Sequence, residues 1–232
     1  MRLDRFLTRR GVHSCKEVAR LLGDGRVAVD GETETSGLRK ITRFSRIVLD
    51  GKILQENDAI YLMLHKPAGH LSATSDPEHP TVIELIDHPR RSELHLAGRL
   101  DRASTGLLLL TNDGRWSRQV TEPDEEISKI YRVTTRDPIS DETAAIFAQG
   151  IYFAFEDLTT RPAQLEIISP HEALISIHEG RYHQVKRMFH AVGNQVRSLH
   201  RESIGPLALD PTLAPGQSRL LTPEEVALFA RP

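Results

Sequence analysis

The sequence predicts an α+β fold in which a small N-terminal module precedes a larger domain built on a mixed, largely antiparallel sheet. Strand patterns outnumber helical ones, they follow one another in consecutive groups, and the pattern changes after a polar stretch at residues 55–58. Consecutive strands favour antiparallel pairing over the regular alternation of strand and helix in a doubly wound sheet. The 232 residues, 39% of them hydrophobic, are enough for a small and a medium domain. We therefore expect domains at residues 1–58 and 59–232.

The first domain is expected to contain two helices followed by short hairpin strands. Apolar residues recur at helical spacing from Leu3. Ser14 and Glu17 have the spacing of a capping box at the start of a second helix. The alternating segments RVAVDGE and SRIVLDGKIL each contain an Asp-Gly turn, which is typical of hairpins.

The second domain begins with a near-continuous apolar strand, YLMLHKP, and a loop rich in Ser, Asp, Pro and His at residues 69–80. Its remaining elements are predicted from periodicity and from turn or cap residues. Further strands are expected at HLAGRLD, GLLLLT, KIYRVTT, 151–155, 163–168 and 173–177, and helices after Asn112-Asp113-Gly114, at 141–148, at HQVKRMFHAVG and at TPEEVALFA, with Thr222 as the cap.

Cysteine and hydropathy patterns indicate a cytoplasmic protein. Cys15 is the single cysteine, so no intramolecular disulfide can form, as is usual in a reducing compartment. The opening MRLDRFLTRR lacks the apolar core of a secretory signal. The purely apolar runs, such as Leu107 to Leu110, are all far too short to cross a membrane.

Positive charge is concentrated in two segments, although the net charge is −2. Residues 1–29 hold seven basic and three acidic residues, and residues 181–201 hold five basic residues and no acidic one. Such local patches on a near-neutral chain indicate contact with a polyanion, while two merely solvated faces remain an alternative. The candidate RNA contacts of the first domain are Arg2, Arg5, Lys16, Arg20 and Arg26; Arg9 and Arg10 add to its positive charge.

The segment GRLDRASTGL places Asp101 in a short loop after a strand, with Arg99 and Arg102 beside it. Neighbouring cations favour the ionised carboxylate. An ionised carboxylate on a loop between rigid strands can serve as a nucleophile or a base. A purely structural salt bridge is the alternative for this loop.

The segment EGRYHQVKRMF predicts an amphipathic helix with cations near its start. If Val185 and Phe189 face the core, Lys186 and Arg187 lie off the apolar stripe. Positive charges at a helix N-terminus oppose the dipole, so they need an anion, for which Asp101 or an RNA phosphate are candidates. An ordinary helix with basic solvent positions remains the alternative.

Eleven histidines raise the question of a metal site. The sequence contains neither a CxxC nor an HExxH pattern, and His183 and His190, seven residues apart, could share one helix face. Two histidines on a basic helix more often contact solvent or phosphate than a metal. No metal site is expected.

Three segments, GRLDRASTGLLLLTNDG, KIYRV and EGRYHQVKRMF, resemble in this order the core motifs of the pseudouridine synthases. MRLDRFL through RVAVDGE is similar to the alpha-L RNA-binding module first known from a small-subunit ribosomal protein, and HKPAGHLSATSDPEHPTV also resembles the RsuA branch, the ribosomal small-subunit pseudouridine synthases. The resemblance covers nearly the whole chain. One departure is Ser14-Cys15 where the family usually has Ser-Arg, so an expected phosphate contact is either missing or shifted to Lys16.

The resemblance implies a role for each matching residue. Asp101 matches the essential aspartate, the catalytic nucleophile, and Lys186 the basic residue that pairs with it. Tyr131 matches the tyrosine that stacks on the target base, Leu199 a position that packs beside the base, and Arg99 would hold the flipped nucleotide. From local chemistry alone, Tyr131 and Leu199 would be ordinary core residues. The remaining residues expected to contact the substrate are Arg181, His183, Gln184 and Arg187.

The implied reaction is the isomerisation of one uridine of small-subunit (16S) ribosomal RNA to pseudouridine by a monomer without cofactor or metal. The target base must leave its stack to be reached. The RNA would be naked or part of a partly assembled particle. Three alternatives remain: the same reaction on large-subunit RNA, a non-catalytic RNA-binding assembly factor, and an aspartate-based phosphate-ester hydrolase, which would need Mg²⁺ and more carboxylates.

Overall fold

The computed structural model describes residues 1–9, 14–121 and 127–229. It contains two compact units, Met1–Ala59 and Ile60–Pro232, called here the N-terminal and the C-terminal unit. Arg10, counted among the basic residues of the first segment, lies outside the described residues. Within the described part of the chain, no helix is long and apolar enough to cross a membrane.

The N-terminal unit packs two helices against a small antiparallel sheet. The capping box at Ser14 and Glu17 is formed, because each side chain accepts a hydrogen bond from the other residue's backbone N–H. The sheet has the strand order β2-β1-β3-β4, and both predicted Asp-Gly turns are present with positive φ at Asp30 and Asp50. The elements are α1 (Leu3–Arg9), α2 (Cys15–Gly23), β1 (Val27–Val29), β2 (Glu32–Thr33), β3 (Ile47–Leu49) and β4 (Lys52–Gln55).

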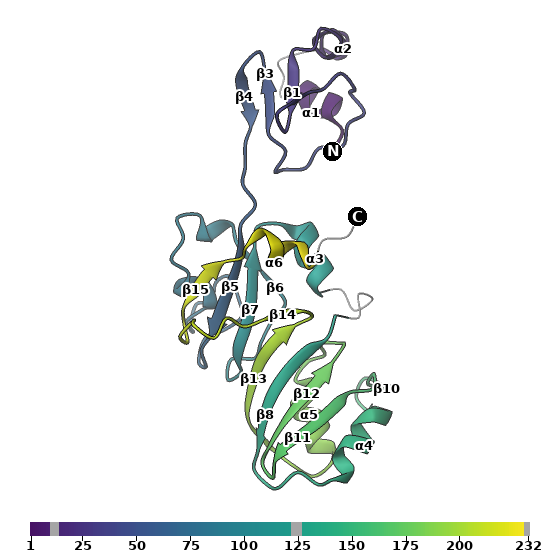
Figure 1. Ribbon diagram of the computed structural model, residues 1–232, viewed down its shortest axis with the longest axis vertical. Coiled ribbons are helices and arrows are strands. Elements are labelled where there is room, and N and C mark those ends of the chain that lie inside the picture. Colours follow the sequence, from purple (N-terminus) through teal and green to yellow (C-terminus); the bar gives the residue numbers. More distant parts are fainter. Residues whose placement is uncertain (10–13, 122–126, 230–232) are drawn as a thin grey trace. The chain divides into compact units, whose positions relative to one another are not determined.

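The C-terminal unit is built on one large sheet with the path β11-β12-β8-β13-β7-β5-β15 (Figure 1). All its described pairings are antiparallel except that of β13 with β7, so the prediction of a mixed, largely antiparallel sheet is confirmed. Strand β14 pairs with β13, and β6 pairs with β7. The strands are β5 (Tyr61–Lys66), β6 (His95–Ala97), β7 (Thr105–Thr111), β8 (Lys129–Thr135), β11 (Gln164–Ser169), β12 (Glu172–Ile177), β13 (Val196–Ile204), β14 (Leu207–Ala208) and β15 (Ser218–Leu220). Strands β9 (Tyr152–Phe153) and β10 (Leu158–Thr159) form a separate ribbon.

Helices and loops cover the sheet of this unit. Strand β7 is buried on both faces: Leu107 and Leu109 pack with Trp116, whereas Leu108 and Leu110 belong to a second cluster. This explains why the strand is an unbroken apolar run. The helices are α3 (Gly114–Thr121), α4 (Glu142–Gln149), α5 (Gln184–Ala191) and α6 (Pro223–Ala227), and single 3₁₀ turns lie at Val82–Leu85 and Arg91–Glu93.

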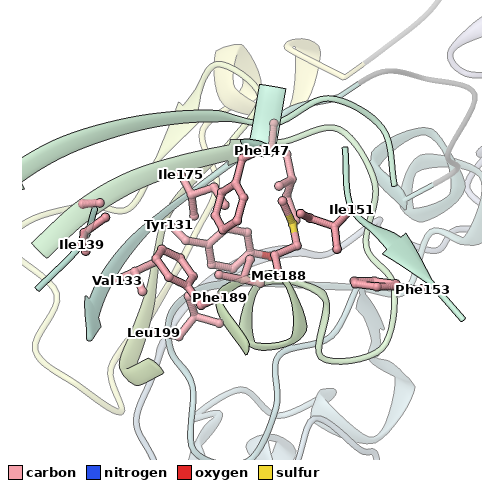
Figure 2. Packing of buried hydrophobic residues seen from close by; sticks show 14 of the residues in the cluster. Tyr131, Val133, Ile139, Phe147, Ile151, Phe153, Ile175, Met188, Phe189 and Leu199 are labelled. Atoms are coloured by element: carbon pink, nitrogen blue, oxygen red, sulfur yellow. The ribbon is translucent and has the colours of Figure 1, made fainter. Parts of the chain in front are cut away.

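A third cluster lies where β8 and β12 pack against α4 and α5. Phe147 and Phe189 meet edge to face at 5.1 Å between ring centroids. Figure 2 shows Tyr131 within this cluster together with Phe189 and Leu199. The cluster therefore fixes the middle of β8 against α5, which positions the site described below.

Besides the short strands β10, β14 and β15, which were not predicted, the structure differs from the sequence prediction in three main places. The longest strand, β13, was not predicted, because its buried positions include Arg201 and Ser203. The strand expected at 151–155 is only the two-residue β9. Helix α5 begins at Gln184, one residue later than the predicted start at His183, because His183 has a left-handed backbone conformation with φ 51°.

Candidate active site

Asp101 lies in a tight turn between β6 and β7. The N–H of Ser104 donates to the backbone oxygen of Asp101 at 3.0 Å. The preceding residue, Leu100, is fixed by Ser72, whose hydroxyl accepts from its N–H at 3.0 Å and donates to its carbonyl at 2.7 Å. Ser72 is buried, so its two hydrogen bonds fix the backbone immediately before Asp101.

Lys66 stabilises the same turn by donating hydrogen bonds to its backbone carbonyls. Its side chain is fully buried, and Nζ donates to the carbonyl oxygens of Pro67, Arg102 and Ser104 at 3.0, 3.2 and 2.8 Å. An ammonium has three hydrogens, so all of them are used. Burial lowers the pKa of Lys66 to about 8, although the charge of Asp101 acts in the opposite direction. Lys66 was not predicted as a residue of the site, although a lysine that ends an apolar strand just before a proline is visible in the sequence.

The two side chains that contact the Asp101 carboxylate come from the start of α5. Lys186 Nζ donates to Oδ2 at 2.7 Å, and His183 Nε2 lies 3.3 Å from Oδ1. The left-handed conformation of His183 lets its ring stack on Tyr182 at 3.8 Å between centroids. Both carboxylate oxygens thus have a partner, and the cations at this helix start have the anion that the dipole argument requires.

The two arginines beside Asp101 in sequence do not pair with it, which corrects our expectation for this loop. Arg102 Nε donates to the carbonyl of Gly69 at 3.1 Å. Among the described residues, the Arg99 side chain makes no hydrogen bond or ion pair. Sequence neighbours on a tight turn point apart, so the electrostatic support of Asp101 comes from Lys186 instead.

A small cavity of about 80 Å³ opens between Asp101, Tyr131 and Leu199. Tyr131 and Leu199 are both nearly buried, so each is a core residue and a wall of the cavity at the same time. Two adjoining cavities of about 310 and 370 Å³ share Arg99 with it. Together they bring the volume around Asp101 into the range of about 300 to 1,000 Å³ that ligand sites occupy.

Three other expected substrate contacts are engaged with protein groups. Arg181 Nε and Gln184 Nε2 donate to the buried carboxylate of Glu179 at 2.9 and 2.8 Å. Arg187 forms a two-point ion pair with Glu156 and lies 3.7 Å over the ring of Phe153. In this state Arg181 and Gln184 line the cavity while bound to Glu179, and Arg187 is directed toward Glu156.

The five basic residues proposed for the N-terminal unit fall into two groups. Arg2, Arg20 and Arg26 form ion pairs with Asp4, Asp24 and Asp50. Arg5 and Lys16 are exposed and make no side-chain hydrogen bond or ion pair among the described residues. A groove of about 560 Å³ runs between α1 and α2 and is lined by Arg5 and Arg9. Free positive charge in this unit thus gathers along the groove.

A search of the described ranges finds no group of three or more His, Cys, Asp or Glu residues that could hold a metal ion. His183 contacts Asp101, and His190 is exposed. The two histidines considered as a candidate pair therefore have separate surroundings.

Comparison with known proteins places this geometry in context. The family described as RNA pseudouridylate synthase matches residues 60–191. A ribosomal small subunit pseudouridine synthase A from Pseudomonas aeruginosa is 49% identical over 97% of this chain and 99% of its own length, and one from Escherichia coli is 46% identical over 98% and 99%. A crystal structure of a pseudouridylate synthase has a TM-score of 0.72 at 38% identity, covering 99% of this chain and 100% of that one.

Proposed function

The chain belongs to the RNA pseudouridylate synthase family, and we propose that it converts one uridine of small-subunit ribosomal RNA to pseudouridine with Asp101 as the nucleophile. The relatives that are similar over their full length carry the small-subunit target in their names. We further propose that the protein is a cytoplasmic monomer, and that its substrate is either naked RNA or RNA in a partly assembled particle.

The observation that carries the assignment of Asp101 is its ion pair with Lys186. The two residues are 85 positions apart in the chain, and the contact measures 2.7 Å beside a cavity walled by Tyr131. A carboxylate must be anionic to attack, and a hydrogen-bonded ammonium stabilises that form and fixes its direction. Asp101 keeps about a quarter of its side chain exposed, so a substrate can reach it.

The reaction is an isomerisation in which every atom of the uridine is retained except one exchanged proton. The uridine flips out of its stack into the site. The bond between N1 and the sugar carbon breaks, the base turns, and carbon 5 forms a new bond to the same sugar carbon. The carbon 5 hydrogen leaves as a proton, and N1 gains one. Asp101 would attack either the base or the sugar carbon, and Tyr131 would provide the surface on which the base stacks.

The N-terminal unit is proposed to grip structured RNA through its phosphates. Arg5 and Arg9 offer exposed positive charge along one groove, and Lys16 is a further exposed cation of the same unit. Phosphate contacts set register and orientation without reading sequence. The choice of uridine would then depend on the fold of the RNA and on the fit of the flipped base.

The test is release of tritium from RNA labelled at carbon 5 of uridine. Small-subunit RNA is supplied naked and with early assembly proteins, and large-subunit RNA is supplied as a further substrate. Wild type should release tritium from at least one of these substrates, and Asp101→Asn should release none while still binding RNA. Asp87→Asn is the matched control, because Asp87 is exposed and makes no side-chain hydrogen bond or ion pair among the described residues. Turnover by Asp101→Asn would remove the nucleophile assignment. Release only from large-subunit RNA would move the target, and no release from any substrate would favour a binding protein.

A further inference from the structure

A cavity of about 310 Å³ adjoins the site of Asp101 and concentrates positive charge. It shares Arg99, Tyr131 and Gly180 with the smaller cavity and is also lined by Lys129 and Arg201. We call it the basic cavity. Neither the ion pair of Asp101 nor the proposed chemistry uses Lys129 or Arg201, so the basic cavity needs its own explanation.

Arg201 is placed in the basic cavity by β13 and is 4% exposed. Its Nε donates to the carbonyl of Leu107 at 2.8 Å, and Nη1 lies 3.4 Å from both the Arg99 carbonyl and Tyr131 Oη. Nη2 is buried and has no partner among the described residues. A buried charged donor without a partner is costly. Both N–H groups of Nη2 are therefore unsatisfied, in a residue that lines the basic cavity.

Lys129, at the start of β8, adds a second cation with which no described carboxylate pairs. It is mostly buried, and its side chain makes no hydrogen bond or ion pair among the described residues. Burial, followed by the charge of Arg201, lowers the pKa of Lys129 to about 8. Two cations held close together in a poorly hydrated place disfavour each other unless an anion joins them.

Glu179, the described carboxylate that lines the basic cavity, does not supply this anion. Its Oε2 accepts from Arg181 Nε at 2.9 Å, and its Oε1 accepts from Gln184 Nε2 and the Arg161 N–H at 2.8 and 2.9 Å. Its charge is thus already balanced by Arg181. Arg99 is exposed at the rim of the basic cavity. The positive charges of Arg99, Lys129 and Arg201 are therefore not balanced by the described carboxylate of the lining.

We propose that the basic cavity is a subsite for one phosphate of the RNA chain, at the linkage next to the flipped uridine. A phosphodiester oxygen accepts well from both a guanidinium and an ammonium. Tyr131 forms a wall of both cavities, so a base stacked on Tyr131 would have its own backbone beside Lys129 and Arg201. The subsite would anchor the extruded nucleotide after flipping. The identity of the anion rests on the proposed function.

The first arm of the test asks whether an anion binds, and it needs no RNA. Inorganic phosphate should raise the melting temperature of wild type and of Lys129→Arg, because a ligand of the folded state stabilises it. Lys129→Gln should lose most of that rise. Arg197→Gln, which removes an exposed charge from the same strand as Arg201, should keep it. Equal protection of all four proteins, or of none, would overturn the anion subsite.

The second arm asks whether the anion is the RNA phosphate. After the pseudouridine made by wild type has been mapped, short RNAs carry one uncharged methylphosphonate on either side of that uridine. Lys129→Gln should bind the natural RNA about tenfold more weakly, with a slope of log K against log salt smaller by about 0.7 to 0.9. The methylphosphonate at one of the two linkages should weaken RNA binding by wild type by a similar factor. The same methylphosphonate should not weaken RNA binding by Lys129→Gln further. Additive losses at both linkages would overturn the phosphate assignment. If wild type makes no pseudouridine, the proposed function fails, and the first arm still decides the subsite.

Discussion

Replacing Gly106 by alanine should destabilise the contact between β7 and β13, which joins the two halves of the large sheet next to the site. Gly106 has φ +106°, and a Cβ there would lie 2.3 Å from the carbonyl oxygen and 2.5 Å from the nitrogen of Arg201. Strands β7 and β13 pair through only two described positions, Thr105 with His200 and Gly106 with Arg201. Strain of a non-glycine residue in this region costs about 1 to 2 kcal/mol, and overpacking costs about 1 to 3 kcal/mol. We expect Gly106→Ala to lose about 2 to 5 kcal/mol of unfolding free energy.

Urea unfolding followed by tryptophan fluorescence measures this loss in the C-terminal unit alone, since Trp116 is the single tryptophan and is buried there. Gly114→Ala is the matched control: an added Cβ meets nothing within 4 Å, and the residue begins a helix. It should change stability by no more than about 1 kcal/mol, in the favourable direction. If the unfolding free energy of Gly106→Ala were within about 0.5 kcal/mol of that of wild type, β7 and β13 would be able to move apart at little cost. That result would refute the argument from close approach.

Three further predictions follow from charged contacts around the site. Lys186→Met should lower single-turnover tritium release by about 100-fold or more with RNA affinity nearly retained; near-normal turnover would remove Lys186 from the mechanism. Between pH 8 and 10.5 the folded state has lost the proton of Lys66 that the unfolded chain still holds, so stability rises with pH. The unfolding free energy of wild type minus that of Lys66→Met should therefore grow by about 2 to 2.5 kcal/mol from pH 7.5 to 10; a constant difference contradicts the burial argument. Glu156→Gln releases the charge of Arg187 and should tighten RNA binding, with a steeper salt dependence; weaker binding would mean that the ion pair orders this segment.

Local signals allowed most elements to be predicted. The capping box at Ser14, the helix cap at Thr222 and the turns at Asp30 and Asp50 form as expected. Each depends on residues within a few positions of one another, so their pattern is visible in the sequence. Strand β13 was missed because its contacts are non-local: Nε of the buried Arg201 donates to a carbonyl 94 residues away.

The site was predictable only in part for the same reason. Asp101 and Lys186 were found through the family resemblance and through the need of a basic helix start for an anion. The support of the turn by Lys66 and Ser72 was not foreseen, since each bonds to backbone carbonyls from another part of the chain. No side-chain pattern marks a backbone acceptor, so such contacts become visible only in the structure.

The parallel contact between β7 and β13 explains why distant segments meet at Asp101. Parallel strands begin at the same edge of a sheet. Asp101 precedes β7, and α5 with Lys186 precedes β13, so the carboxylate and the ammonium are delivered to that edge from the two halves of the sheet (Figure 1). Arg201 crosses the same contact, because its side chain reaches the carbonyl of Leu107 on β7. One close backbone approach, made possible by the absence of a side chain at Gly106, therefore sets both the ion pair and the basic cavity. A displacement of β13 should accordingly alter turnover and anion binding together, and a variant that changes one without the other would show that the two features are positioned independently.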